Sequence, residues 1–168
     1  ERTENLIYGY DLFASSPTTF APATDIPVPL DYVLGPGDML SINIFGGSST
    51  IEQVDIKIKR NGTIEIPGIS AIGIGGLTLE EARKLVNIRV GAEFLGATTT
   101  ISVTEFRSMK IFVLGDAYQP GSYTVSSLTT ISNAMYVSGG VSEKGSLRNI
   151  QLKRNGEVIQ TYDLYDLL

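Results

Sequence analysis

Three residue types are missing from this chain: it has no cysteine, no histidine and no tryptophan. Without cysteine there is no disulfide, no thiolate nucleophile and no cysteine-based metal site. Without histidine the chain lacks the most common general base and the usual transition-metal ligand. Any catalysis would have to rest on carboxylates, lysine or tyrosine, and the sequence indicates no catalytic, cofactor-binding or metal-binding residue.

Basic charge and long apolar runs are also scarce. The 168 residues include 13 Lys and Arg against 18 Asp and Glu, a formal net charge of −5. An acidic chain lacks the basic surface that binds nucleic acid, so no nucleic-acid partner is expected. No run of about 18 apolar residues occurs, which predicts no membrane-spanning helix in this sequence. Because the chain opens on Glu1 without a signal peptide, we expect a fragment of a longer protein.

Glycine, threonine, serine and β-branched residues are plentiful, which favours strands and turns. We expect an α+β protein with two small β-rich domains at 32–106 and 107–168. Residues 1–31 are proline-rich without helical or strand period, which predicts an extended arm. Its apolar residues are expected to dock in part on a domain or a neighbouring chain: Leu6, Ile7, Tyr8, Tyr10, Leu12, Phe13 and Phe20.

The first domain opens on the turn sequence Gly-Pro-Gly-Asp, in which Asp38 is interpreted as a turn or capping acid. A capping box formed by Thr78 and Glu81 predicts a helix that ends at Gly91 or continues toward Gly96. Alternating apolar residues predict strands over 40–45, 54–59, 64–66 and 98–106.

The second domain reads as strand, strand, helix and hairpin, the order of a β-grasp, in which one helix packs on a small mixed sheet. "KIFVLGD" (110–116) predicts a mostly buried strand, and Pro120-Gly121 predicts the turn to the next. "SSLTTISNAMYVSGG" predicts a short helix that Gly139 or Gly140 ends, and "RNIQLKRNGEVIQTYDL" predicts the hairpin.

The tetrapeptide "KRNG" occurs at both 59–62 and 153–156. It is either a repeated basic ligand clamp or turn chemistry, and Asn-Gly between strands favours a hairpin. The first copy predicts a three-residue loop with Gly62 left-handed, which pairs Ile58 with Ile64 and Ile56 with Ile66. The second predicts a two-residue loop, which pairs Arg154 with Glu157 and Leu152 with Ile159. Candidate subunit contacts at these tips are Arg60, Asn61, Arg154 and Asn155.

Three other patterns carry a functional alternative. "GIGG" (73–76) hints at a phosphate loop but lacks the Gly-Lys-Ser/Thr of a P-loop. Asp38, Asp116 and Glu143 could supply a glycosidase with carboxylates, although nothing in the sequence pairs them. Tyr118 and Tyr123 flank the Pro120-Gly121 turn and could stack on sugar rings, but they are more simply read as covering that turn.

The order of these motifs resembles a known family. "DYVLGPGDMLSINIFG" followed by "VDIKIKRNGTIEIPGISAIGIGGLTLEEARKLV" is similar to the polysaccharide export domain of outer-membrane polysaccharide export proteins of the Wza type. The segment from "MKIFVLGDAYQPGSYTV" to "DLYDLL" is similar to the SLBB β-grasp domain that follows it there. This chain lacks the lipidated cysteine and C-terminal amphipathic helix of that family. Its last domain stops before the usual closing strand, so the resemblance implies a domain truncated at its C-terminal end.

The resemblance also implies a protein without catalysis or cofactor. It would form ring-shaped homo-oligomers in the periplasm, associated with the outer membrane, and pass capsular or exopolysaccharide outward. Its implied partners are the polysaccharide, copies of itself and an inner-membrane polysaccharide co-polymerase that regulates chain length. The alternatives are a soluble carbohydrate-binding module and a carboxylate-based hydrolase.

Overall fold

The computed structural model describes residues 27–46 and 52–167. The chain divides into two compact units, an N-terminal unit of Ala23–Ser108 and a C-terminal unit that contains Met109–Leu168. Both mix helix and strand, which confirms the α+β prediction. The apolar arm residues between Leu6 and Phe20 lie outside the described residues. The described end of the arm contacts the N-terminal unit, because the carbonyl of Leu30 accepts a hydrogen bond from the Glu80 N–H at 3.1 Å.

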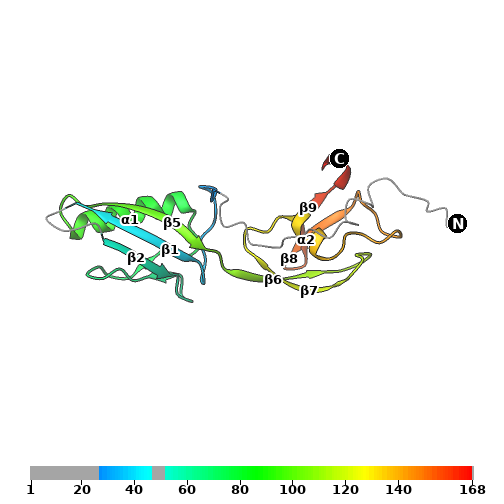
Figure 1. Ribbon diagram of the computed structural model, residues 1–168, viewed down its shortest axis with the longest axis horizontal. Coiled ribbons are helices and arrows are strands. Elements are labelled where there is room, and N and C mark those ends of the chain that lie inside the picture. The colour runs from blue at the N-terminus through cyan, green and yellow to red at the C-terminus, as the bar shows by residue number, and fades with distance from the viewer. Residues whose placement is uncertain (1–26, 47–51, 168) are drawn as a thin grey trace. The chain divides into compact units, whose positions relative to one another are not determined.

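The N-terminal unit is built on a three-stranded antiparallel sheet in the order β2-β1-β5 (Figure 1). The strands are β1 (Met39–Phe45), β2 (Glu52–Lys57) and β5 (Thr98–Glu105). In the central strand Leu40 and Ile42 are fully buried, and their partners on β5 are Val103 and Ile101. The alternation that predicted these strands therefore gives the sheet its apolar face.

Helix α1 (Leu79–Glu93) covers this sheet and packs against β5. Its buried residues recur every three or four positions, as one face of a helix requires: Leu79, Ala82, Val86 and Val90. The helix passes through Gly91 and ends at Glu93. The predicted capping box is confirmed, since the Thr78 hydroxyl accepts a hydrogen bond from the Glu81 N–H and the Glu81 carboxylate accepts one from the Thr78 N–H.

Thr78→Ala removes the hydroxyl that accepts from the Glu81 N–H and is expected to lower the free energy of unfolding by about 1 kcal/mol. Thr78→Ser keeps the hydroxyl and is the matched control, with stability close to wild type. Urea denaturation of the full chain measures both. Equal unfolding free energies for wild type and Thr78→Ala would contradict the capping role.

The same box should respond to acid. Hydrogen bonds from the N–H and hydroxyl of Thr78 hold the pKa of Glu81 below its ordinary value. A carboxylate with a lowered folded pKa stabilises the fold fully above its ordinary pKa of about 4.3, and this contribution is lost as pH falls through the folded value. The stability difference between wild type and Glu81→Gln, which cannot ionise, should hold at neutral pH and shrink in acid. A difference independent of pH would rule this out.

Two short strands, β3 (Thr63–Ile64) and β4 (Ile72–Gly73), pair with each other beside this sheet. The C-terminal unit contains β6 (Ser108–Val113, beginning at the unit boundary), β7 (Gly121–Ser126), β8 (Ile150–Arg154) and β9 (Glu157–Tyr162). It also contains α2 (Ile131–Val137) and a closing 3-10 helix, η2 (Leu164–Leu167). Neither described α-helix combines the length and apolar character needed to cross a membrane.

The C-terminal unit differs from the expected mixed sheet. Its described strands form two separate two-stranded sheets, β6-β7 and β8-β9. The core instead gathers around α2, where Met135 packs with Leu147 and Leu164 from the loops and η2. Strand β6, which was expected to be mostly buried, is largely exposed to solvent, and its Phe112 is 68% exposed. An apolar run shows that a strand can be buried, whereas the residues that would cover it come from elsewhere in the fold.

Candidate functional site

The turn that opens the first domain is tied to three parts of the N-terminal unit. The Leu34 N–H donates to the Leu77 carbonyl at 2.9 Å, just before α1. The Gly37 N–H donates to the Ile58 carbonyl at 3.0 Å, just after β2. The side chain of Asp38 then reaches the end of β5. The turn therefore lies where helix and sheet meet, and its acid is fully buried.

The Asp38 carboxylate accepts four hydrogen bonds. Oδ1 accepts from the Tyr32 hydroxyl at 3.0 Å and the Arg107 N–H at 2.8 Å. Oδ2 accepts from the Gly35 N–H at 2.8 Å and the Arg107 guanidinium at 2.7 Å. The guanidinium also donates to the Tyr32 hydroxyl at 3.0 Å. A buried charge is tolerated only when it is paired and hydrogen-bonded in this way.

This arrangement makes Asp38 a structural acid. Its bond from the Gly35 N–H closes the turn, as the capping interpretation predicted. With four donors on two oxygens, no lone pair is left for proton transfer to a substrate. Of the other carboxylates that could serve a hydrolase, Asp116 and Glu143 are exposed in the C-terminal unit. Among the described residues no three metal-ligating side chains cluster.

The first "KRNG" forms the predicted three-residue loop. The Lys59 N–H donates to the Thr63 carbonyl and the Gly62 N–H to the Lys59 carbonyl, both at 2.9 Å. Gly62 has φ +78°, which confirms its left-handed conformation. Asn61 holds the loop, accepting from the Thr63 N–H and hydroxyl, and so acts in turn chemistry. The predicted pairing of Ile56 with Ile66 is wrong, because β2 pairs with β1, where Ile56 lies opposite Leu40, and β3 pairs with β4.

The glycine-rich stretch 73–76 packs against this loop. The Gly62 carbonyl accepts from the N–H groups of Ile74 and Gly75 at 2.9 and 2.8 Å. A Cβ on Gly75 would lie 2.7 Å from the Gly62 Cα, so glycine is needed for the two backbones to approach. The stretch that hinted at a phosphate loop is therefore a packing surface for the hairpin tip.

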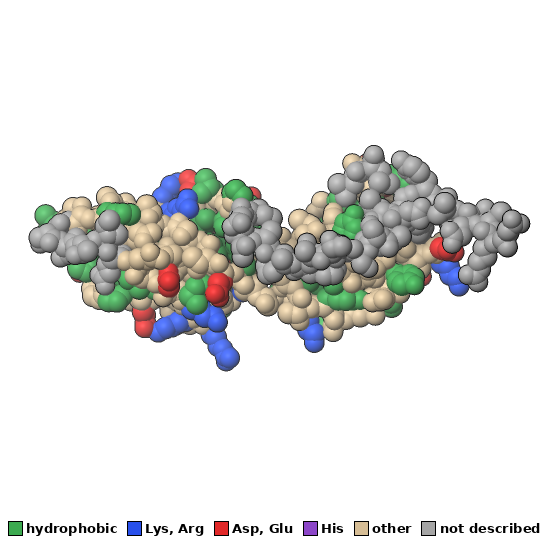
Figure 2. All heavy atoms as spheres, in the orientation of Figure 1, with side chains coloured by type: hydrophobic (Ala, Val, Ile, Leu, Met, Phe, Trp, Pro, Cys, Tyr) green, Lys and Arg blue, Asp and Glu red, His purple; other side chains and the backbone are tan. Residues whose placement is uncertain are grey.

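An open groove of about 390 Å³ lies between this tip and the domain-opening turn. Its lining residues are Pro36, Gly37, Lys57, Ile58, Lys59 and Arg60. Lys and Arg side chains gather and project here, below β2 in Figure 2. The tetrapeptide pattern indicated Arg60 as a candidate residue but not Lys57, because Lys57 lies at the end of β2, outside the tetrapeptide.

The second "KRNG" forms a two-residue loop, as predicted. Asn155 and Gly156 have φ of 53° and 86°, and Arg154 pairs with Glu157. The predicted pairing of Leu152 with Ile159 is wrong, because Leu152 pairs with Gln160. A β-bulge between Leu152 and Lys153 inserts one extra residue on β9 and shifts the register.

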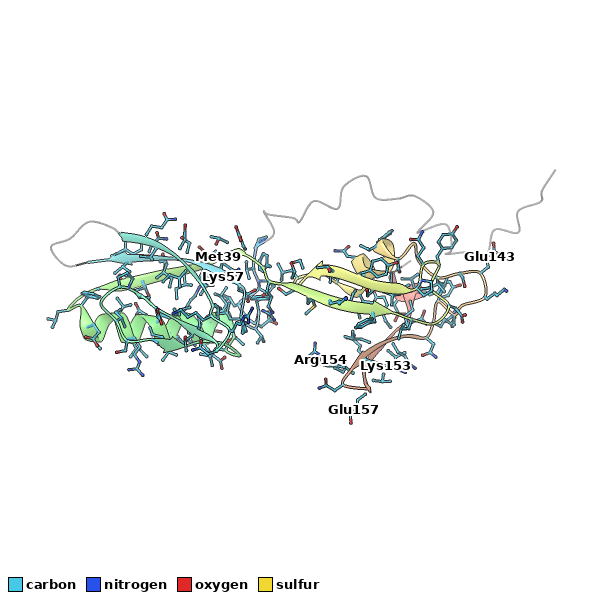
Figure 3. The ribbon with its side chains drawn as sticks, turned by 90° about the horizontal axis from the view of Figure 1, so that it is seen from below. Met39, Lys57, Glu143, Lys153, Arg154 and Glu157 are labelled. Carbon is cyan, nitrogen blue, oxygen red and sulfur yellow. The ribbon has the colours of Figure 1, made fainter. Side chains whose placement is uncertain are left out.

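The ribbon β8-β9 projects from its unit, with Lys153, Arg154 and Glu157 at its end (Figure 3). Every residue from 151 to 161 is exposed, including Val158 at 49% and Ile159 at 53%. An isolated two-stranded hairpin is marginally stable in water, so such a ribbon favours contact with another surface.

The two tyrosines proposed for sugar contact have different surroundings. Tyr118 is 68% exposed, and its ring lies beside Gly139, where an added Cβ would be 3.0 Å from the Tyr118 Cδ1. The Tyr123 hydroxyl donates to the Gln119 carbonyl at 2.6 Å, so this side chain folds over the Pro120-Gly121 turn. Of the two, Tyr118 presents its ring to solvent in the way that stacking on a sugar needs.

Two family models match successive parts of the chain. Residues 26–104 match a family described as polysaccharide biosynthesis/export protein. Residues 110–162 match the SLBB domain.

Two relatives from Escherichia coli, both called polysialic acid transport protein KpsD, are 27% and 26% identical to this chain over 140 residues. These matches cover 82% of this chain and 25% of each relative. The EPS I polysaccharide export outer membrane protein EpsA of Ralstonia nicotianae is 24% identical over 123 residues, 72% of this chain and 32% of that protein. The chain thus spans about a quarter of the length of the E. coli relatives. Both matches come in the order that the motifs predicted, and with the relatives they confirm the predicted resemblance to the polysaccharide export protein family.

Proposed function

We propose that this chain is a periplasmic part of a bacterial channel that exports capsular polysaccharide or exopolysaccharide across the outer membrane. The observation that carries the proposal is the consecutive match of its two units to the export family and the SLBB domain. Relatives named for polysialic acid transport and for polysaccharide export at the outer membrane support it.

In this proposal the chain acts without catalysis, as a ring-forming component. Asp38 is engaged in structural hydrogen bonds, and the described residues contain no metal-ligating cluster. Ring contacts need exposed surfaces that gain stability from a second copy. The exposed apolar residues Val158 and Ile159 on the β8-β9 ribbon, and Phe112 on strand β6, support this part of the proposal. An inner-membrane polysaccharide co-polymerase completes the proposed assembly.

The proposal is tested in cells that carry the full-length protein. Deleting the gene should abolish surface polysaccharide while its synthesis inside the cell continues. A photocrosslinking residue in place of Ile159 should give a ladder of homo-oligomers. The same residue in place of Leu95, in the N-terminal unit, is the comparison position. Surface polysaccharide at wild-type levels in the deletion strain would contradict the function, and a purely monomeric protein at both positions would contradict the ring.

A carbohydrate-binding module without a transport role is the second candidate, because Tyr118 is exposed in the C-terminal unit. In that case the host polysaccharide should change tyrosine fluorescence, and Tyr118→Ala should remove the change. Tyr123→Phe is the matched control, since it removes only the hydroxyl that bonds to the Gln119 carbonyl. A gene deletion that leaves export intact while binding persists would favour this candidate over the channel.

A further inference from the structure

Basic side chains line the groove between the domain-opening turn and the first hairpin tip. Lys57, Lys59 and Arg60 line it together with Pro36, Gly37 and Ile58. At about 390 Å³ it is large enough for a sugar unit, within the range of small-ligand pockets. Because the groove is open, it suits a polymer that slides along it better than a small molecule that a closed pocket would surround.

The charges of the groove stand out against the acidic chain, whose net charge is −5. Lys59 forms an ion pair with Glu65, which offsets part of its charge. Lys57 and Arg60 make no ion pair with any residue in 27–46 or 52–167. Two cations therefore remain available to a ligand in a molecule that otherwise repels anions.

The backbone that carries these cations is held in place. The Ile58 N–H donates to the Asp38 carbonyl at 2.9 Å, and the Ile58 carbonyl accepts from the Gly37 N–H at 3.0 Å. These bonds fix the floor of the groove to the domain-opening turn. The tip is fixed from the other side by the bonds from Ile74 and Gly75 to the Gly62 carbonyl. A rigid backbone lowers the ordering cost when a ligand binds.

We propose that this groove binds the carboxylate groups of an acidic polysaccharide, with Lys57 and Arg60 as the contacting cations. The proposal rests on the proposed export function and names its substrate class. Guanidinium and ammonium groups form charge-assisted hydrogen bonds with carboxylates. Because the cations are exposed, each contact is weak and dependent on salt, which suits a polymer that must enter and leave repeatedly.

The test is a binding titration of the full chain at low salt with polysialic acid as the acidic probe and dextran as the neutral probe. Wild type should bind polysialic acid and not dextran, more weakly as salt rises. Lys57→Gln/Arg60→Gln should weaken binding by roughly 2- to 30-fold, the range expected for two exposed charge contacts. Arg89→Gln/Lys144→Gln makes the same change in net charge at two exposed positions that do not line the groove, and should bind as wild type.

A charge-preserving variant guards against misfolding: Lys57→Arg/Arg60→Lys should bind nearly as wild type. The inference is overturned by equal affinity for dextran, by no binding of polysialic acid to wild type, or by equal losses in the groove and control variants. These results leave the export function standing as long as the gene deletion abolishes surface polysaccharide. A deletion strain that exports normally would instead remove the function on which the inference rests.

Discussion

Replacing Asp38 with alanine is expected to lower the free energy of unfolding of the N-terminal unit by about 3–5 kcal/mol, the cost of removing one partner from a buried ion pair. The carboxylate is fully buried and accepts hydrogen bonds from two N–H groups, a tyrosine hydroxyl and a guanidinium. Alanine leaves the N–H groups of Gly35 and Arg107 and the Tyr32 hydroxyl without this acceptor. Urea denaturation of the full chain, followed by hydrogen exchange of β1 peptides, measures the loss.

Two further variants serve as controls for this prediction. Asp55→Ala removes an exposed acid from β2 of the same sheet and should change stability by no more than about 0.5 kcal/mol. Asp38→Asn keeps the size of the side chain and one oxygen but loses the charge, so its stability should fall between wild type and Asp38→Ala. If Asp38→Ala lowered the free energy of unfolding no more than Asp55→Ala, the hydrogen bonds of Asp38 would not hold the turn to the end of β5.

Local signals in the sequence predicted much of the N-terminal unit. The capping box at Thr78, the alternation of β1 and the left-handed Gly62 each depend on a few neighbouring residues, and each is present in the structure. The role of Asp38 was predicted only in part. Its turn is local, but Arg107 lies 69 residues along the chain, and nothing in either segment alone indicates that they meet.

The C-terminal unit shows where sequence patterns are least informative. Its second "KRNG" turn was predicted correctly, because Asn155 and Gly156 carry their own conformational preference. The bulge on β9 has no comparable local signal, so the register beyond Lys153 was wrong. The exposure of Phe112 was also missed, because burial depends on what covers a strand as much as on its own residues.

The close approach of the two loops beside the groove leads to the second large expected effect. Gly75→Ala should lower the free energy of unfolding by about 1–3 kcal/mol, the range for forcing extra atoms into a packed site. The added Cβ would lie 2.7 Å from the Gly62 Cα, and backbone cannot rotate away as a side chain can. Either the two loops separate, with loss of the bonds to the Gly62 carbonyl, or the tip that carries Arg60 moves.

Gly73→Ala is the matched control in the same stretch, because a Cβ there meets no atom within 4 Å. Its stability should equal that of wild type or exceed it slightly, since alanine restricts the unfolded chain more than glycine does. Hydrogen exchange at the Ile74 and Gly75 amides reports directly on the bonds to Gly62, and exchange should accelerate only in Gly75→Ala. Equal stability and equal exchange in the two variants would mean that the loops do not pack together, and that the tip beside the groove is held by its own turn alone.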